Sequence, residues 1–128
     1  MKVYRSAAIY YVIQGVAVIA WWVVLFGVPT SRKYFILEQE SEFSLLAFWL
    51  ADISFLGLGS LAAAWLCFRR HEYSQIVAWF VTGAVSYAAI YCFAFAMITD
   101  YGWLGVTLML PAMIWSGVFA VGMTFEKT

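Results

Sequence analysis

The chain has 128 residues, of which 66% are hydrophobic, 20% are aromatic and only 11% are charged. Soluble domains carry about 25% charged residues and about 45–50% apolar residues, so this composition excludes an ordinary soluble domain and predicts an integral membrane protein. The formal net charge is zero, which leaves no basic surface of the kind that binds nucleic acid.

Four long apolar stretches, separated by short groups of charged residues, predict four transmembrane helices. They cover about residues 7–28, 44–68, 75–98 and 103–125. Each has the roughly 20 residues that a helix needs to cross about 30 Å of hydrocarbon. The stretches lack the alternation of apolar and polar residues that membrane β-strands show. The predicted fold class is therefore all-α, with residues 1–128 forming a single transmembrane domain, a four-helix bundle.

The distribution of Lys and Arg predicts that the N-terminus and the C-terminus both lie in the cytoplasm. Cytoplasmic loops of membrane proteins are enriched in these residues. In this topology only Arg32 and Lys33 lie outside. The other five of the seven basic residues are cytoplasmic, namely Lys2, Arg5, Arg69, Arg70 and Lys127. We therefore expect a protein of the cell (inner) membrane with both ends inside.

The first predicted span carries one polar residue near its middle and two tryptophans closer to its outer end. Gln14 is expected to form hydrogen bonds to other helices, which contribute roughly 0.6–2 kcal/mol. Trp21 and Trp22 follow two turns later. The outer loop at 29–43 contains glutamates at every second position (Glu38, Glu40 and Glu42). This spacing does not place the carboxylates on one face of a helix, so no metal site is predicted there.

Asp52 is the formally charged residue that lies inside a predicted span, about eight residues from the outer end of the second helix. An ionisable residue at such a depth is unfavourable in lipid, usually faces the bundle or a cavity, and suggests a functional site. It could serve as a proton-coupled group, as the counter-ion of a cationic ligand or as a hydrogen-bond anchor. The alternative is a structural aspartate bonded to Tyr or Trp. Gly59, Ser60 and Ala63 share its predicted face, which is expected to pack against another helix.

The third predicted span carries a polar and aromatic stripe at intervals of four residues, and the fourth contains a proline. The stripe comprises Trp79, Gly83, Tyr87 and Tyr91. Matching depths along the helices puts Tyr91 level with Asp52. Pro111 is expected to kink the fourth helix at about the same depth.

Together these residues predict a pocket in the outer leaflet, at the level of Asp52, Tyr91, the paired tryptophans and Pro111. Aromatic walls with one carboxylate suit a lipophilic cation or the polar group of a lipid. The alternative is that the aromatic side chains only fill the core of the bundle. Gln14 lies at a different level and is kept as a separate candidate. The candidate ligand-binding residues are Asp52, Tyr91, Tyr87, Trp21, Trp22 and Gln14.

The residues used for covalent, metal or cofactor chemistry are few. Cys67 and Cys92 are predicted at levels roughly 20–25 Å apart, which excludes a disulfide within the chain. His71 is the one histidine, and a single histidine without further ligands is a poor metal site. No nucleotide-binding or hydrolase motif is present. No cofactor is predicted, and an enzymatic activity is not supported.

In chain length, number of spans and a membrane acid among aromatic residues, the chain is similar to the small multidrug exporters. In that family the acid lies on the first helix. Here the first helix carries Gln14, and the acid, Asp52, is on the second. The resemblance therefore implies the architecture of a four-helix membrane bundle, and no residue role is carried over from it.

The sequence leaves three functions open. The first is a non-enzymatic accessory or assembly subunit of a membrane complex, in contact with membrane lipids and with further subunits or copies of itself. The second is a binder or transporter of a lipophilic small molecule or lipid, including cationic ones, that uses Asp52. The third is a membrane enzyme that modifies lipid.

Overall fold

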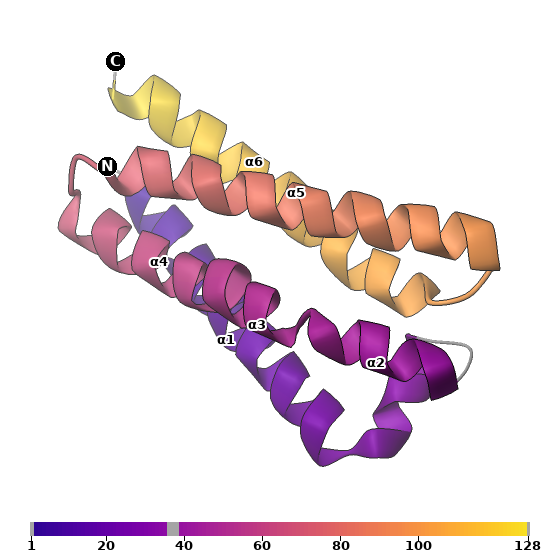
Figure 1. The fold of residues 1–128 in the computed structure, drawn as a ribbon. Helices are drawn as coiled ribbons and strands as arrows, with labels where there is room; N and C mark the ends of the chain where they lie inside the picture. The colour runs from indigo at the N-terminus through magenta and orange to yellow at the C-terminus, as the bar shows by residue number, and fades with distance from the viewer. Residues whose placement is uncertain (1, 36–38, 128) are drawn as a thin grey trace.

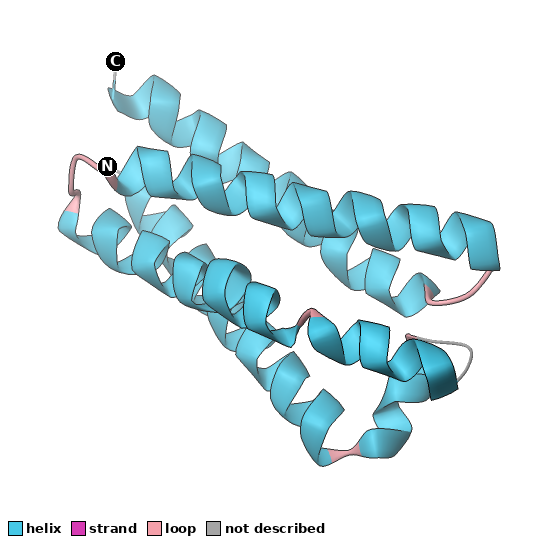
Figure 2. Ribbon diagram, viewed as in Figure 1, coloured by secondary structure: helices cyan, strands magenta, loops and turns pink. Residues whose placement is uncertain are grey.

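The computed structural model describes residues 2–35 and 39–127, and these residues form helices and short connections without any strand (Figure 1). Three spans are single helices, and the second span is divided into four segments. Figure 2 shows the helices and the short connections between them. The single helices are α1 (Lys2–Gly27), α5 (Ser74–Thr99) and α6 (Trp103–Lys127). The second span consists of α2 (Gln39–Ala47), α3 (Trp49–Ala51), the π-helix η2 (Asp52–Leu58) and α4 (Gly59–Arg69). A short 3-10 helix, η1 (Pro29–Tyr34), follows α1.

Within the part of the chain that the structure describes, four helical segments are long and apolar enough to cross a membrane, which agrees with the predicted number of spans. They are Lys2–Gly27, Phe43–Arg69, Ser74–Thr99 and Trp103–Glu126. Large apolar side chains such as Ile13, Val23, Ile76 and Ile98 are exposed on their outer faces. Such a surface is unfavourable in water and favourable in hydrocarbon, so the fold is consistent with location in a membrane.

The spans are arranged as two pairs. α1 packs along α4 and η2, and α5 packs along α6. Figure 1 shows the pairs close together where both chain termini lie and further apart at the opposite end. We call the end of the bundle that holds the chain termini and the α4–α5 connection the terminal end. We call the opposite end, which holds η1 and the α5–α6 turn, the loop end.

Small residues allow the helices to approach closely in the terminal half of the bundle. The alanines of this core are at most 2% exposed, and they come from all four spans: Ala7, Ala8, Ala63, Ala64, Ala78 and Ala120. A very close approach occurs at Gly15 of α1. A Cβ atom there would lie 2.8 Å from Leu61 Cγ and 2.9 Å from the Gly57 carbonyl oxygen. No side chain fits at this position unless α1 and the second span move apart.

The second span is less regular than the sequence predicts. The helix is interrupted at Phe48, and η2 follows from Asp52. A π-helix holds one more residue per turn than an α-helix, is rare, and is frequent at functional sites. The extra residue shifts the faces beyond it by one position. Ser60 and Ala63 are fully buried, and Gly59 is partly buried. A Cβ atom built at Gly59 would lie 3.4 Å from Val81 Cγ2 of α5. All three residues therefore pack against another helix, as the sequence predicts.

Two contacts join η1 to the α5–α6 turn at the loop end. The Tyr101 hydroxyl group donates a hydrogen bond to the Lys33 carbonyl oxygen. Gly102 has a φ of +77°, and a Cβ atom there would lie 3.1 Å from the Phe35 carbonyl oxygen. Glycine is the residue that adopts this backbone conformation readily. These contacts hold Phe35 where its ring centroid lies 4.7 Å from that of Trp21.

The remaining polar residues lie largely as predicted. Cys67 and Cys92 are free thiols. His71 is exposed in the α4–α5 connection, and its ring centroid lies 5.1 Å from that of Tyr73. The acidic part of the predicted outer loop lies outside what the structure describes. It comprises Glu38 and the side chains of Glu40 and Glu42.

Candidate functional site

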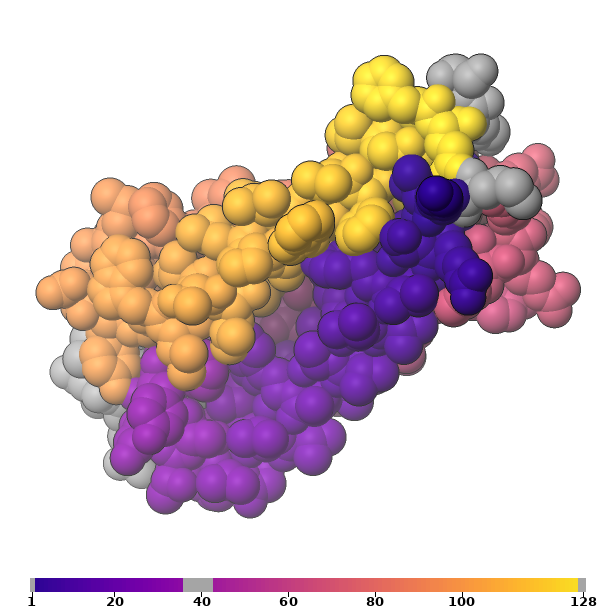
Figure 3. All heavy atoms as spheres, turned by 180° about the vertical axis from the view of Figure 1, so that it is seen from behind, coloured from indigo at the N-terminus to yellow at the C-terminus, as the bar shows by residue number. Residues whose placement is uncertain are grey.

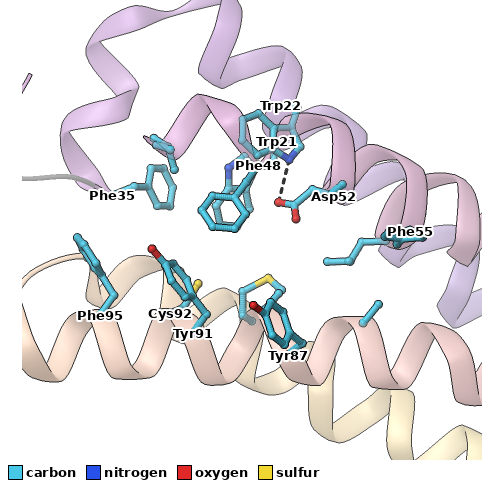
Figure 4. A pocket seen from close by; sticks show the side chains of 18 of the residues that line it. Trp21, Trp22, Phe35, Phe48, Asp52, Phe55, Tyr87, Tyr91, Cys92 and Phe95 are labelled. Atoms are coloured by element: carbon cyan, nitrogen blue, oxygen red, sulfur yellow. Dashed lines mark hydrogen bonds between the residues drawn. The ribbon is translucent and has the colours of Figure 1, made fainter. Parts of the chain in front are cut away.

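A pocket of about 470 Å³ lies between the second span and α5 in the loop-end half of the bundle (Figure 4). Binding sites for small molecules have volumes of about 300–1,000 Å³. We call it the Asp52 pocket, because Asp52 is the acidic residue among the described residues that line it. No Lys, Arg or His side chain is among these described lining residues. Its aromatic lining comprises Trp21, Trp22, Phe35, Phe48, Phe55, Tyr87, Tyr91 and Phe95.

Asp52 is the first residue of η2, and its side chain is held from α1. The indole nitrogen of Trp22 donates a hydrogen bond to Asp52 Oδ2 over 3.1 Å, and Trp22 itself is only 3% exposed. Figure 4 shows the carboxyl group beside the Trp22 indole and the Phe48 ring, on the side of the pocket opposite Tyr87 and Tyr91. Among the described residues Asp52 has this one side-chain partner and no cationic one. A carboxylate in an apolar region is costly unless it is paired, so part of its bonding capacity is left for a molecule in the pocket.

The aromatic walls leave the pocket open at the side of the bundle. The Phe48 and Tyr91 rings pack together across the mouth, with their centroids 5.1 Å apart. Tyr87 is 73% exposed and Tyr91 is 45% exposed, and Phe55 on the second span is also exposed. Because these rim residues lie on helices that are long and apolar enough to cross a membrane, the opening would face lipid if the protein lies in one. A molecule could therefore reach Asp52 from the membrane without passing through the loops.

The structure brings five of the six candidate residues together around the Asp52 pocket. They are Asp52, Tyr87, Tyr91, Trp21 and Trp22. The stripe predicted on the third span borders the pocket at its two tyrosines, the two members predicted to bind a ligand. Gly83 and Trp79, one and two turns further from the loop end than Tyr87, are also exposed and do not line the pocket.

Gln14 belongs to a different part of the molecule, a buried hydrogen-bond network in the middle of the bundle. Its amide nitrogen donates to Ser60 Oγ over 2.9 Å. Its amide oxygen accepts from Ser116 Oγ over 2.9 Å and from the Tyr10 hydroxyl group over 2.5 Å. The network links α1, α4 and α6 and uses the amide without any ligand. Gln14 does not line the Asp52 pocket.

A second pocket, of about 510 Å³, lies between α1 and α6. Figure 3 shows this face, where the two helices meet near the termini and diverge towards the loop end. Pro111 lines this second pocket and not the Asp52 pocket. The prediction that Pro111 contributes to the Asp52 pocket was therefore wrong, because the residue faces α1 and not α5. Three residues border both pockets and form the wall between them: Trp21, Phe35 and Met109.

Several lining residues were missed by the sequence analysis, and only some of them carry a signal. Phe48 and Phe55 lie four residues before and three residues after Asp52, the spacing of neighbours on one helix face. They could have been predicted. Phe35 and Phe95 line the pocket because of how the loop end folds and how the spans pair. No local pattern in the sequence predicts these contacts.

The hydrogen bond from Trp22 should contribute to stability. We expect Trp22→Phe to lower the free energy of unfolding by about 1–3 kcal/mol, because Asp52 then loses its donor inside an apolar pocket. Titration with sodium dodecyl sulfate in detergent micelles, followed by circular dichroism, measures this change. The control is Trp79→Phe, since Trp79 is exposed. Equal losses in the two variants would contradict the assigned role of the bond.

The arrangement suits binding better than catalysis. It offers one carboxylate, aromatic faces and indole and phenol groups, which provide ion pairing, cation–π attraction and hydrogen bonds. Within residues 2–35 and 39–127 no group of three or more His, Cys, Asp or Glu side chains could hold a metal ion.

Comparisons of the chain with protein-family models, with curated proteins and with solved structures found no match.

Proposed function

We propose that the protein binds lipophilic cations, such as long-chain amines, in the Asp52 pocket. One observation supports this above all: the Asp52 carboxyl group faces an aromatic pocket and has no cationic partner among the described lining residues. A cationic ligand would supply the missing charge, and the surrounding rings attract cations through their faces. The apolar remainder of the lining would hold the hydrocarbon part of the ligand.

We further propose that the loop end lies on the outer side of the membrane. The support is the position of the basic residues, of which Lys2, Arg5, Arg69 and Arg70 lie at the terminal end. Positively charged residues are enriched on the cytoplasmic side. The side opening of the Asp52 pocket would then face the outer leaflet, and a ligand already dissolved in that leaflet could enter between the second span and α5.

The proposal predicts a difference between a charged and an uncharged ligand of the same shape. In lipid nanodiscs the protein should bind dodecylammonium at least about tenfold more tightly than dodecanol, because an interaction with a charged partner contributes about 1.5–3 kcal/mol. Asp52→Asn should remove this difference. Equilibrium dialysis with radiolabelled ligands measures both affinities, with empty nanodiscs as the reference for partition into lipid.

Asp100→Asn provides a matched control for this experiment. Asp100 also accepts a hydrogen bond from a tryptophan, Trp103 Nε1, over 3.2 Å. It is exposed and lies outside the pocket, so the preference for the amine should persist in Asp100→Asn. If wild type binds both ligands equally, or if Asp52→Asn keeps the preference, the proposal is wrong. The hypothesis of an accessory or assembly subunit would then take its place.

A further inference from the structure

Trp21 carries a polar atom that the bundle itself does not satisfy. Its indole nitrogen is buried and has no hydrogen-bond partner among the described residues. An indole N–H group can only donate, and buried donors in proteins nearly always find an acceptor. The neighbouring residue, Trp22, meets this requirement by donating to Asp52. A bound molecule could supply the acceptor that the described residues do not offer to Trp21.

The position of Trp21 relates this donor to the Asp52 pocket. Trp21 lines the pocket. Figure 4 shows its ring behind that of Phe48 in this view, and its centroid lies 4.7 Å from that of Phe35. The Asp52 carboxyl group is already bonded to Trp22 and does not serve Trp21. Two polar groups beside the pocket thus lack a full set of partners, the carboxyl group of Asp52 and the indole N–H group of Trp21, which is buried behind the lining in this conformation.

We propose, building on the function proposed above, that the pocket selects amphiphilic amines that also carry a hydrogen-bond acceptor a few bonds from the nitrogen. Long-chain vicinal amino alcohols are the simplest members of this class. The ammonium group pairs with Asp52, the hydroxyl oxygen accepts from Trp21 Nε1, and the chain lies along the apolar lining. Side-chain rotations of the kind that commonly accompany binding bring the indole N–H into reach.

The test compares two amines of equal chain length, one with and one without a vicinal hydroxyl group, in the nanodisc assay. Wild type should bind the amino alcohol roughly threefold to tenfold more tightly than the alkylamine, the effect of one hydrogen bond that satisfies a buried donor. Trp21→Phe should bring this ratio to about one. Trp79→Phe, outside both pockets, should retain it. Asp52→Asn should weaken the binding of both amines.

The ratio of the two affinities is not affected by partial unfolding, because inactive protein lowers the active fraction for both ligands alike. Should Trp21→Phe fail to fold, benzothienylalanine at position 21 replaces the N–H group by sulfur and keeps the ring shape. A ratio near one in wild type, or a ratio that survives loss of the N–H group, overturns the selection for an acceptor and leaves the binding of amines at Asp52 intact. Absence of amine binding in wild type overturns both proposals.

Discussion

Gly15→Val is expected to lower the free energy of unfolding by about 3 kcal/mol, which is at the upper end of the range for overpacking in a tight interior. The added atoms would meet Leu61 Cγ at 2.8 Å and the Gly57 carbonyl oxygen at 2.9 Å. The Leu61 side chain can rotate away, but the Gly57 oxygen belongs to the backbone of η2. Relief therefore requires α1 and the second span to separate. Titration with sodium dodecyl sulfate, followed by circular dichroism, measures the effect.

The matched control is Gly83→Val, which makes the same change in the middle of another span. No atom lies within 4 Å of a Cβ atom built at Gly83. Both variants change backbone freedom and helix propensity alike, so the difference between them isolates the contact between α1 and the second span. Equal losses of stability would show that this contact does not limit the packing of the pair.

Gln14→Leu is expected to cost about 2 kcal/mol of stability, because it removes the centre of the buried network. Ser60 Oγ and Ser116 Oγ would lose their amide partner inside the bundle. The Tyr10 hydroxyl group would lose its bond to Gln14 and keep the one to the Ala112 carbonyl oxygen over 3.0 Å. Unsatisfied buried polar groups cost about 1–3 kcal/mol, while hydrogen bonds between membrane helices average about 0.6 kcal/mol. The same denaturation assay in detergent measures the loss.

Gln75→Leu is the control for this variant. Among the described residues Gln75 makes one side-chain hydrogen bond, which its amide nitrogen donates to Thr124 Oγ1 over 2.5 Å in a partly buried position. Gln75→Leu should therefore lower the free energy of unfolding by less than Gln14→Leu does. Adding Ser60→Ala and Ser116→Ala to Gln14→Leu should recover part of the loss, because no polar partner is then left unsatisfied. If the triple variant is less stable than the single one, the cost does not come from unsatisfied groups.

The number and limits of the spans could be predicted from the sequence because they follow from one strong constraint. A helix must present about 20 apolar residues to cross the hydrocarbon, and the charged groups of this chain mark where each run ends. Depth along a span also follows directly from the rise per residue. This is why Trp22 and Tyr91 could be placed level with Asp52 before their contacts were known.

Which residues of a helix border the pocket could not be predicted as well. Trp79 and Gly83 share a face with Tyr87 in the sequence, yet both lie away from the pocket. This happens because the helix pairs diverge towards the loop end, so only the last turns of that face border the opening. Pro111 was assigned to the wrong pocket for a similar reason. The depth of Pro111 along α6 did not show whether this residue faces α1 or α5.

The π-helix η2 also determines where the length of this chain can vary. An α-helix turns by about 100° per residue, so losing one residue from α4 would rotate the whole loop-end half of the span relative to the terminal half. Exposed side chains such as Phe43 and Leu50 would then turn towards the other helices. Losing one residue from Asp52–Leu58 would instead convert the π turn into an α turn and leave the faces on both sides unchanged. Proteins with this fold could therefore differ by one residue within the π segment and keep the same surfaces towards lipid.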